Sequence, residues 1–329
     1  MGNSINDTLA LIKNIDASTA QFVNEWHNDL PYITAMTSGS TGSPKSIKLS
    51  KKDIIKSAEA TCRYFNINNS STLVLPLSTN YIAGKMMVVR AIVSGANLWI
   101  EMPSNRPLNI NYGNIDLLPI VPSQVDWIIE NYQYSHNTIR NLLIGGGALS
   151  SKKENVLISM GINAFVSYGM TETCSHIALR PIGSNEYETL PGIIVSIDER
   201  SCLVIKAPEF SYKEITTNDI VEIIDERHFV WRGRYDNVIN TGGIKVFPEE
   251  IEKKLSSIIP YPFYVIGDNH EKWGESVTLY IESNNNAIDE SKILNDAATL
   301  LMKYELPKKI KCVDKFVYTE SKKIKRLLL

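Results

Sequence analysis

The chain has 329 residues, of which 43% are hydrophobic and 21% are charged, and its formal net charge is -2. This composition is ordinary for a globular protein, and it lacks the basic excess that marks a nucleic-acid binder. The four cysteines show no C-x-x-C spacing, which argues against a zinc or dithiol motif. The N-terminus lacks a signal-peptide pattern, and no segment reaches the roughly 20 apolar residues that cross a bilayer. We therefore expect a cytoplasmic protein without a membrane span.

The apolar spacing of residues 1–30 predicts one or two amphipathic helices, which Pro31 ends. Residues 32–36 are typical of a strand that leads into a polar loop at 37–45, and Ser50 can cap a following helix. Four further apolar runs predict buried strands with helices between them: 72–77, 96–100, 115–120 and 141–144. This alternation predicts an α/β fold, with sheets flanked by helices.

After about residue 185, short strands separated by turn residues replace the alternation. They are expected at 193–197, 202–206, 220–224 and 229–232, and they predict a small β subdomain of the larger domain. Two helices and two strands are expected beyond them, at 248–255, 291–304, 264–266 and 276–281. We therefore predict a large N-terminal domain over residues 1–235 and a smaller, mobile α+β domain over residues 236–329.

The first motif that indicates chemistry is the loop Thr37-Ser-Gly-Ser-Thr-Gly-Ser-Pro-Lys45. Glycines and small hydroxylated residues let backbone N–H groups approach phosphate oxygens, and Lys45 adds positive charge. A Walker P-loop that starts at Gly39 would need glycine at position 44, where this chain has Pro44. The loop therefore indicates a phosphate site of another kind, and the alternative is a flexible loop rich in serine and glycine.

The second motif is Tyr168-Gly-Met-Thr-Glu172. Its aromatic ring can stack on a base, its hydroxyl can touch a phosphate, and its carboxylate can hold Mg²⁺. The same five residues also suit an ordinary loop at the end of a strand, so this motif alone does not decide between the two.

Two further motifs lie near the C-terminus. Gly233-Arg-Tyr-Asp236 is followed by Asn240-Thr-Gly-Gly-Ile-Lys245, whose glycine pair permits either a close approach to a ligand or a simple hairpin. The last motif is a basic stretch that contains Lys322, Lys323, Lys325 and Arg326. A basic tail of this kind is often only a solvated surface.

In this order and at these distances, the four motifs resemble those of the acyl-adenylate-forming superfamily, which contains acyl-CoA ligases, luciferases and nonribosomal peptide adenylation domains. The resemblance covers residues from about 32 to the C-terminus. It implies an enzyme that uses ATP and Mg²⁺ to convert a small-molecule carboxylic acid into an acyl-adenylate. Coenzyme A is then the implied cosubstrate, and the product is a thioester.

The resemblance also implies roles for single residues. Lys323 bridges the carboxylate and the α-phosphate, Thr171 contacts the α-phosphate, and Glu172 binds Mg²⁺. The implied nucleotide contacts are Thr37, Ser38, Gly39, Ser40, Thr41, Gly42 and Lys45 for the pyrophosphate, Gly145, Gly146 and Gly147 for the adenine and acyl site, Tyr168 with Gly169 and Met170 for adenine, and Asp219 with Arg234 for the ribose. Asp236 is the implied hinge, and Gly242, Gly243 and Lys245 belong to the segment that enters the site for thioester formation.

The chain departs from the superfamily's pattern in several places. Lys322 and Asn218 stand where glycine is usual, and the stretch Leu75–Gly84 lacks the histidine often found in the acyl-pocket motif. Only 36 residues precede the phosphate loop, whereas members of the superfamily usually have well over a hundred there.

The short length and the segments SYGMTET, LPGI and YIAGKMMVVRAIVSG resemble the 2-succinylbenzoate–CoA ligases of menaquinone biosynthesis. That resemblance implies an aryl acid with a keto group and a second carboxylate, for which Lys85 and His176 are candidate contacts. Alternatively, Lys85 is a surface lysine and His176 a hydrogen-bonded wall residue. The remaining alternatives are another acyl- or aryl-CoA ligase, a stand-alone adenylation enzyme, and a non-catalytic acyl or nucleotide binder. The sequence does not predict the oligomeric state.

Overall fold

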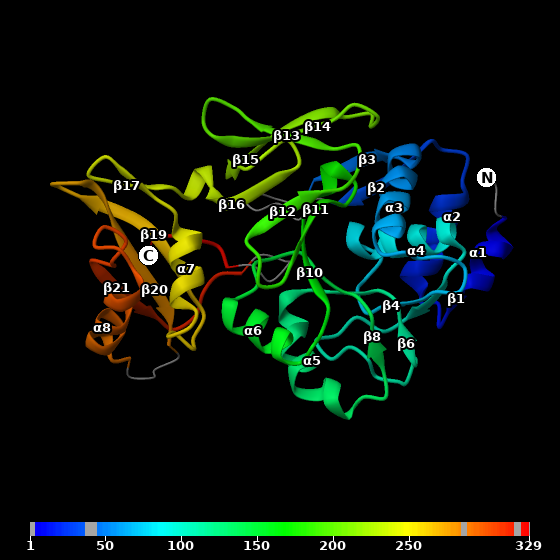
Figure 1. Cartoon of the computed structure of the whole chain (residues 1–329), viewed down its shortest axis with the longest axis horizontal. Coiled ribbons are helices and arrows are strands. Elements are labelled where there is room, and N and C mark those ends of the chain that lie inside the picture. The colour runs from blue at the N-terminus through cyan, green and yellow to red at the C-terminus, as the bar shows by residue number, and fades with distance from the viewer. Residues whose placement is uncertain (1–3, 37–44, 284–287, 319–323, 329) are drawn as a thin grey trace. The chain divides into compact units, whose positions relative to one another are not determined.

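The computed structural model describes residues 4–36, 45–283, 288–318 and 324–328 (Figure 1). The chain divides into two compact units. The first consists of Met1–Leu149, Lys153–Ile194 and Lys206–Glu214, and the second of Ser150–Lys152, Val195–Ile205 and Ile215–Leu329. This division groups most of the expected β subdomain with the C-terminal part. The predicted domains, which are defined by movement at Asp236, stay a prediction.

The N-terminal helices begin and end where local chemistry favours it. The helices are α1 (Ile5–Leu11), α2 (Ala17–His27), α3 (Lys51–Tyr64), α4 (Ile82–Ser94), α5 (Val125–Asn131) and α6 (Ser151–Ser159). Ser4 and Asp7 form a capping box at α1, and the Asp16 side chain caps α2. Ser50 is the N-cap residue of α3, as expected, but its side chain makes no capping hydrogen bond. Gly95, with φ 72°, ends α4.

The strands up to residue 189 form four sheets. They are β1 (Ile12–Lys13), β2 (Tyr32–Met36), β3 (Ser46–Ser50), β4 (Thr72–Leu75), β5 (Asn97–Ile100), β6 (Asn114–Ile115), β7 (Leu118–Ile120), β8 (Thr138–Ile139), β9 (Leu142–Ile144), β10 (Ala164–Gly169), β11 (His176–Pro181) and β12 (Glu186–Thr189). A parallel sheet has the order β1-β5-β4, and β7, β9 and β10 are parallel neighbours followed by antiparallel β11 and β12. The pairs β2-β3 and β6-β8 complete the set.

Two apolar cores hold this unit together. One lies among α2, α3, α4 and the sheet of β4 and β5, and includes Phe22, Ile54, Leu73 and Met86. The other lies among β7, β9, β10, α5 and α6, and includes Ile120 and Leu157 among its buried residues. The strands β4, β7 and β9 are nearly continuous apolar runs because they are buried on both faces.

The later strands form two groups. The first group is β13 (Ile194–Ile197), β14 (Cys202–Ala207), β15 (Lys213–Ile223) and β16 (His228–Arg234), in that order. The second is β17 (Ile239–Thr241), β18 (Ile244–Val246), β19 (Phe263–His270), β20 (Gly274–Glu282) and β21 (Lys309–Val313), with helices α7 (Pro248–Leu255) and α8 (Glu290–Leu300).

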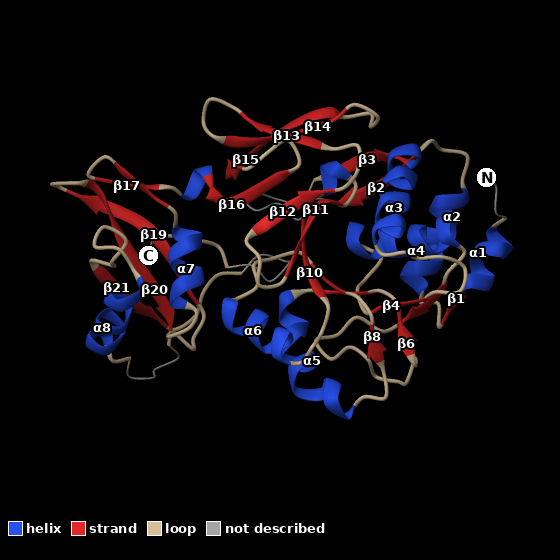
Figure 2. Cartoon of the chain, viewed as in Figure 1, coloured by secondary structure: helices blue, strands red, loops and turns tan. Residues whose placement is uncertain are grey.

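The C-terminal strands have the order β18-β17-β20-β19, and β21 runs parallel to β20. Figure 2 shows α7 and α8 beside this sheet, and Ile251 and Leu255 from α7 and Ala297 from α8 are buried in its core. The predicted α/β fold with flanking helices is confirmed. Among the helices that the structure describes, none is long and apolar enough to cross a membrane.

Candidate nucleotide and acid site

Part of the predicted site lies outside the described residues. This holds for Lys323 and for the phosphate-loop residues Thr37, Ser38, Gly39, Ser40, Thr41 and Gly42. Lys45, the last residue of that loop, is exposed directly before β3. The implied roles of these residues stay predictions.

The glycine triplet Gly145–Gly147 directly follows β9, and β9 pairs in parallel with β10. A Cβ atom on Gly145 would lie 2.7 Å from Ser167 Oγ, and Gly146 has φ 82°, so a side chain is disfavoured at both positions. The carboxyl ends of neighbouring parallel strands are the usual ligand edge of an open α/β sheet. The structure therefore brings the triplet beside Ser167, the residue that precedes Tyr168.

The segment from Tyr168 to Glu172 continues β10 into a tight turn. The Thr173 hydroxyl accepts a hydrogen bond from Met170 N (3.0 Å) and donates one to Ser175 O (2.8 Å), and these two bonds close the turn. A Cβ atom on Gly169 would lie 2.3 Å from Ser175 O, so only glycine fits there. The Tyr168 ring lies 5.9 Å from that of Tyr187.

The carboxylate of Glu172 is exposed on this turn, while Thr171 is buried. Among the residues that the structure describes, no group of three or more His, Cys, Asp or Glu side chains could hold a metal. Mg²⁺ is commonly held by one or two carboxylates together with substrate phosphates and water. The exposed carboxylate of Glu172 fits a magnesium ion that arrives with a nucleotide.

The predicted ribose and hinge residues form one hydrogen-bonded cluster in the second unit. Asp219 on β15 is opposite Arg234 on β16, and its Oδ1 accepts from Trp231 Nε1 at 3.1 Å and lies 3.7 Å from an Arg234 guanidinium nitrogen. Arg234 also reaches Asp236 at 3.2 Å. Asn218, which stands where the superfamily usually has glycine, lies 3.3 Å from the same carboxylate. The sequence thus located these three residues without predicting that they contact one another.

The glycine pair Gly242-Gly243 forms the turn between β17 and β18, with φ values of 60° and 85°. Positive φ at both central residues is the geometry of a tight two-residue hairpin turn. The hairpin alternative is therefore confirmed. Lys245 is exposed on β18, and its role in thioester formation stays a prediction.

Lys85 is buried inside α4, so the surface alternative is wrong. Its ammonium group donates to Glu25 Oε2 and to Thr34 O, both at 2.7 Å, and lies 4.9 Å from the centre of the Phe22 ring. These contacts tie α4 to α2 and β2 and compensate the buried charge. Contact between Lys85 and a substrate stays a prediction, and the contacts seen in the structure do not add support for it.

Arg90, one and a half turns further along α4, was not selected from the sequence. Its side chain is 2% exposed, and it donates to Ser175 Oγ at 2.9 Å and to Met87 Sδ at 3.4 Å, while Nε has no partner among the described residues. None of the carboxylates in the described part of the chain pairs with it, and burial lowers its pKa to about 10. A buried cation without an anion is costly. The sequence signal was the single charge inside the apolar run of residues 86–93.

His176 begins β11 and lies next to Ser175. Its Nε2 is 3.1 Å from Thr61 Oγ1, and burial, with a contribution from the Arg90 charge, holds the pKa of His176 well below its usual value. The ring is therefore neutral. His176 also lines a cavity of about 300 Å³, so the alternative of a hydrogen-bonded wall residue fits the structure, and contact with a substrate stays a prediction.

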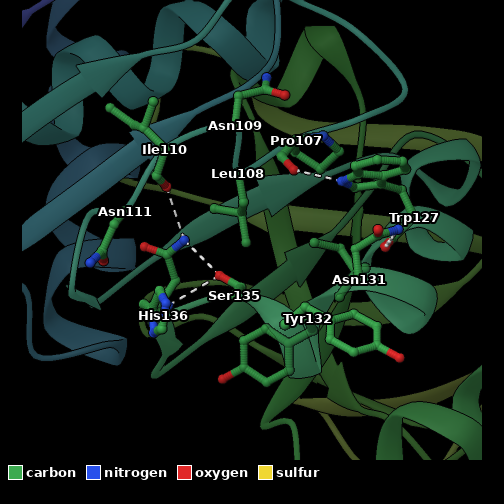
Figure 3. Close-up of a pocket in the computed structure, with 13 residues that line it drawn as sticks. Pro107, Leu108, Asn109, Ile110, Asn111, Trp127, Asn131, Tyr132, Ser135 and His136 are labelled. Carbon is green, nitrogen blue, oxygen red and sulfur yellow. Dashed lines mark hydrogen bonds between the residues drawn. The ribbon is translucent and has the colours of Figure 1, made fainter.

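A second cavity of about 300 Å³ lies elsewhere in the first unit (Figure 3). Trp127 donates to the Pro107 carbonyl at 2.9 Å and Asn137 donates to the Ile110 carbonyl at 3.0 Å, which fixes its walls. Of the predicted site residues that the structure describes, none lines this cavity.

A family model described as AMP-binding enzyme matches residues 5–202. This is more than half of the chain, and the protein belongs to that family. It is similar to the 2-succinylbenzoate–CoA ligase of Listeria monocytogenes, with 25% identity over 96% of this chain and 73% of the relative.

Two solved structures have the same fold. An AMP-forming acyl-CoA synthetase/AMP-acid ligase II-like protein from Dyadobacter fermentans is 29% identical, with a TM-score of 0.64 over 98% of this chain and 96% of its own. The O-succinylbenzoate coenzyme A synthetase of Bacillus subtilis, solved with ATP and magnesium, is 19% identical, with a TM-score of 0.76 over 89% of this chain and 68% of its own. At that identity the second likeness shows the fold alone.

Proposed function

We propose that the protein is an ATP-dependent acid–CoA ligase that forms an acyl-adenylate and then a CoA thioester, with 2-succinylbenzoate as its acid. In this proposal it acts in menaquinone biosynthesis in the cytoplasm. The Listeria relative carries that enzyme name. The structural observation that carries the choice of acid is the buried guanidinium of Arg90, which has no carboxylate partner within the described chain.

Arg90 donates a hydrogen bond to Ser175, the residue before His176, so its charge gives the cavity wall at His176 a positive potential. An acid with two carboxylates can present one to the nucleotide and the other to this wall, where the neutral His176 ring supplies a hydrogen-bonding group. The second carboxylate then provides the anion that the buried cation lacks. Benzoate or a fatty acid has no such group.

For the nucleotide, we assign ribose recognition to Asp219 and Arg234, and the adenine wall to Gly145–Gly147 with Tyr168. When bound with ATP, Mg²⁺ neutralises charge on the phosphates, and Glu172 is the residue that would hold it. Attack by a carboxylate on the α-phosphate brings two anions together. Lys323 offsets that repulsion by placing a cation between them.

For the second half-reaction, we assign the hinge to Asp236 and the CoA-facing segment to Gly242, Gly243 and Lys245. The exposed hairpin and the hydrogen-bonded cluster at Asp236 support this assignment. Two half-reactions with different partners favour a moving element that completes the site twice.

The test is a CoA-ligation assay with ATP and Mg²⁺ that offers 2-succinylbenzoate, benzoate and a fatty acid to the wild type and to Lys323→Ala. We expect a thioester from 2-succinylbenzoate that Lys323→Ala does not form. Turnover of another acid would keep the ligase and discard the choice of acid. If no acid gave an adenylate or a thioester, the protein would be a non-catalytic binder.

A further inference from the structure

The chain on either side of residues 319–323 is held together in the second unit. Tyr318 and Ile324 form an antiparallel bridge, and Lys325 N donates to Val317 O at 2.8 Å. Residues 319–323 include Lys323, and they lie outside the described residues.

The N-terminal flank is fixed to the end of β20. Glu282 Oε2 accepts hydrogen bonds from Phe316 N at 2.7 Å and from the Tyr318 hydroxyl at 2.9 Å. Phe316 is 4% exposed, and its ring centre lies 4.9 Å from that of Tyr264. Two hydrogen bonds to a carboxylate and one buried ring thus hold residues 316–318 in a fixed position beside β20.

The C-terminal flank is fixed by a bidentate ion pair. Arg326 donates to both carboxylate oxygens of Glu252 on α7, at 2.7 and 2.8 Å, and to Val265 O at 2.8 Å. Glu252 Oε1 also accepts from Val265 N at 2.6 Å. One residue further on, Leu327 O accepts from the buried Tyr264 hydroxyl at 2.6 Å. Arg326 therefore joins the chain three residues after Lys323 to both α7 and β19.

This pair differs from an ordinary surface ion pair. The side chains of Arg326 and Glu252 are only 21% and 20% exposed, and the fork geometry of a bidentate guanidinium fixes orientation as well as distance. A lysine or glutamine at position 326 can keep some contacts but cannot reproduce the fork. A segment that needed only to pack against the sheet would not require this guanidinium fork at position 326.

We propose that Arg326, through Glu252, is a positioning residue for Lys323 in the adenylation step. This inference rests on the proposed function, in which Lys323 bridges the acid and the α-phosphate. Small displacements of a reacting group cost large factors in rate, because catalysis depends on pre-set geometry. The ion pair fixes the chain three residues after Lys323, and in this proposal Arg326 acts on the reaction only through that lysine.

The experiment compares Arg326→Gln and Arg326→Lys with a matched control, Lys254→Gln. Lys254 also lies on α7 and makes an ion pair of 2.9 Å with Glu305, a residue that is 8% exposed. Adenylation is followed by ATP–pyrophosphate exchange, and transfer to CoA by thioester formation from supplied acyl-adenylate. We expect Arg326→Gln to slow exchange by about 10- to 100-fold, with KM for ATP and the transfer step changed by less than about threefold. Arg326→Lys should fall between, and Lys254→Gln should match the wild type.

The decisive measurement is the double variant with Lys323→Ala. If Arg326 acts through Lys323, adding Arg326→Gln to Lys323→Ala causes no further loss of exchange. A further loss equal to that of the single variant would mean that Arg326 acts independently, and would overturn the proposal. If Arg326→Gln fails to fold by circular dichroism, Glu252→Gln, which keeps the shape of the side chain, takes its place in the same cycle.

Failure of this inference is distinguishable from failure of the proposed function. Normal exchange in Arg326→Gln, with exchange strongly slowed in Lys323→Ala, overturns only the positioning role. Exchange that is as fast in Lys323→Ala as in the wild type, or is absent from the wild type with every acid, overturns the proposed function and this inference with it.

Discussion

Replacement of Arg90 by methionine should move stability and substrate affinity in opposite directions. Burial lowers the pKa of Arg90 from 12.5 to about 10, and a shift of that size corresponds to about 3 kcal/mol of disfavoured charge in the folded state. Arg90→Met removes the charge and keeps an unbranched apolar chain in place. It also loses the hydrogen bond to Ser175, worth about 1 kcal/mol. We therefore expect a net gain in the free energy of unfolding of about 1–2 kcal/mol.

The same change should weaken binding of a dianionic acid. Loss of a charge-assisted interaction of about 1.5–3 kcal/mol corresponds to a rise in KM for 2-succinylbenzoate of roughly 10- to 100-fold. Turnover of benzoate, where it is measurable, should not change, because benzoate has no second carboxylate. Arg90→Lys is the matched variant, since it keeps the charge while losing the planar fork.

Urea unfolding and steady-state kinetics with both acids test these expectations together. The reasoning would be refuted by an Arg90→Met protein that is less stable than the wild type and loses activity equally toward both acids. That outcome would make Arg90 a structural residue whose burial is compensated elsewhere.

Three other changes have defined outcomes. Burial raises the pKa of Glu252 from 4.5 to about 7, so the contribution of its protonated form to stability is complete below pH 4.5 and is lost as the pH rises through about 7. Glu252→Gln should therefore show a smaller loss of stability between about pH 5 and pH 8 than the wild type when both are unfolded in urea. A pH profile parallel to that of the wild type would contradict this. Gly169→Ala places a Cβ atom 2.3 Å from Ser175 O and should destabilise the protein by about 1–3 kcal/mol with slower adenylation; an unchanged melting temperature would show that the turn can relax. Lys85→Met leaves the part-buried carboxylate of Glu25 without its cation and should lower the free energy of unfolding by about 1–3 kcal/mol. KM for the acid should stay the same, whereas the predicted substrate contact requires a raised KM.

Elements with a strong local pattern were predictable from the sequence. The strand expected at 32–36 is β2, and the apolar runs at 72–77 and 141–144 contain β4 and β9, because consecutive buried apolar residues bounded by turns leave few alternatives. The glycine pair at 242–243 forms the hairpin that was one of its two interpretations. β3, directly before α3, was missed, since its pairing with β2 depends on a partner on the other side of the predicted phosphate loop.

Side-chain partnerships were less predictable, because they depend on residues far apart in the chain. Lys85 was selected as a substrate contact, yet its carboxylate partner, Glu25, lies 60 positions away and in a different helix. The residues Asp219, Arg234 and Asp236 were assigned to two separate functions, ribose binding and the hinge, although strand pairing brings all three into one cluster. Neither fact follows from periodicity or from motif spacing.

Lys85 and Arg90 lie on one helix and are both buried, and they differ in whether the fold neutralises their charge. Lys85 has Glu25 at 2.7 Å, so nothing further is needed to hold its ammonium group inside. Arg90 has a hydroxyl and a sulfur atom as its partners, and its charge adds to the effect of burial that keeps the neighbouring His176 neutral. A fold that needed only packing at position 90 would gain stability from an apolar residue there. The cost of the uncompensated cation is therefore best explained by an anion that is present only when the substrate is bound, and this reasoning favours Arg90 over Lys85 as the residue that selects a second carboxylate.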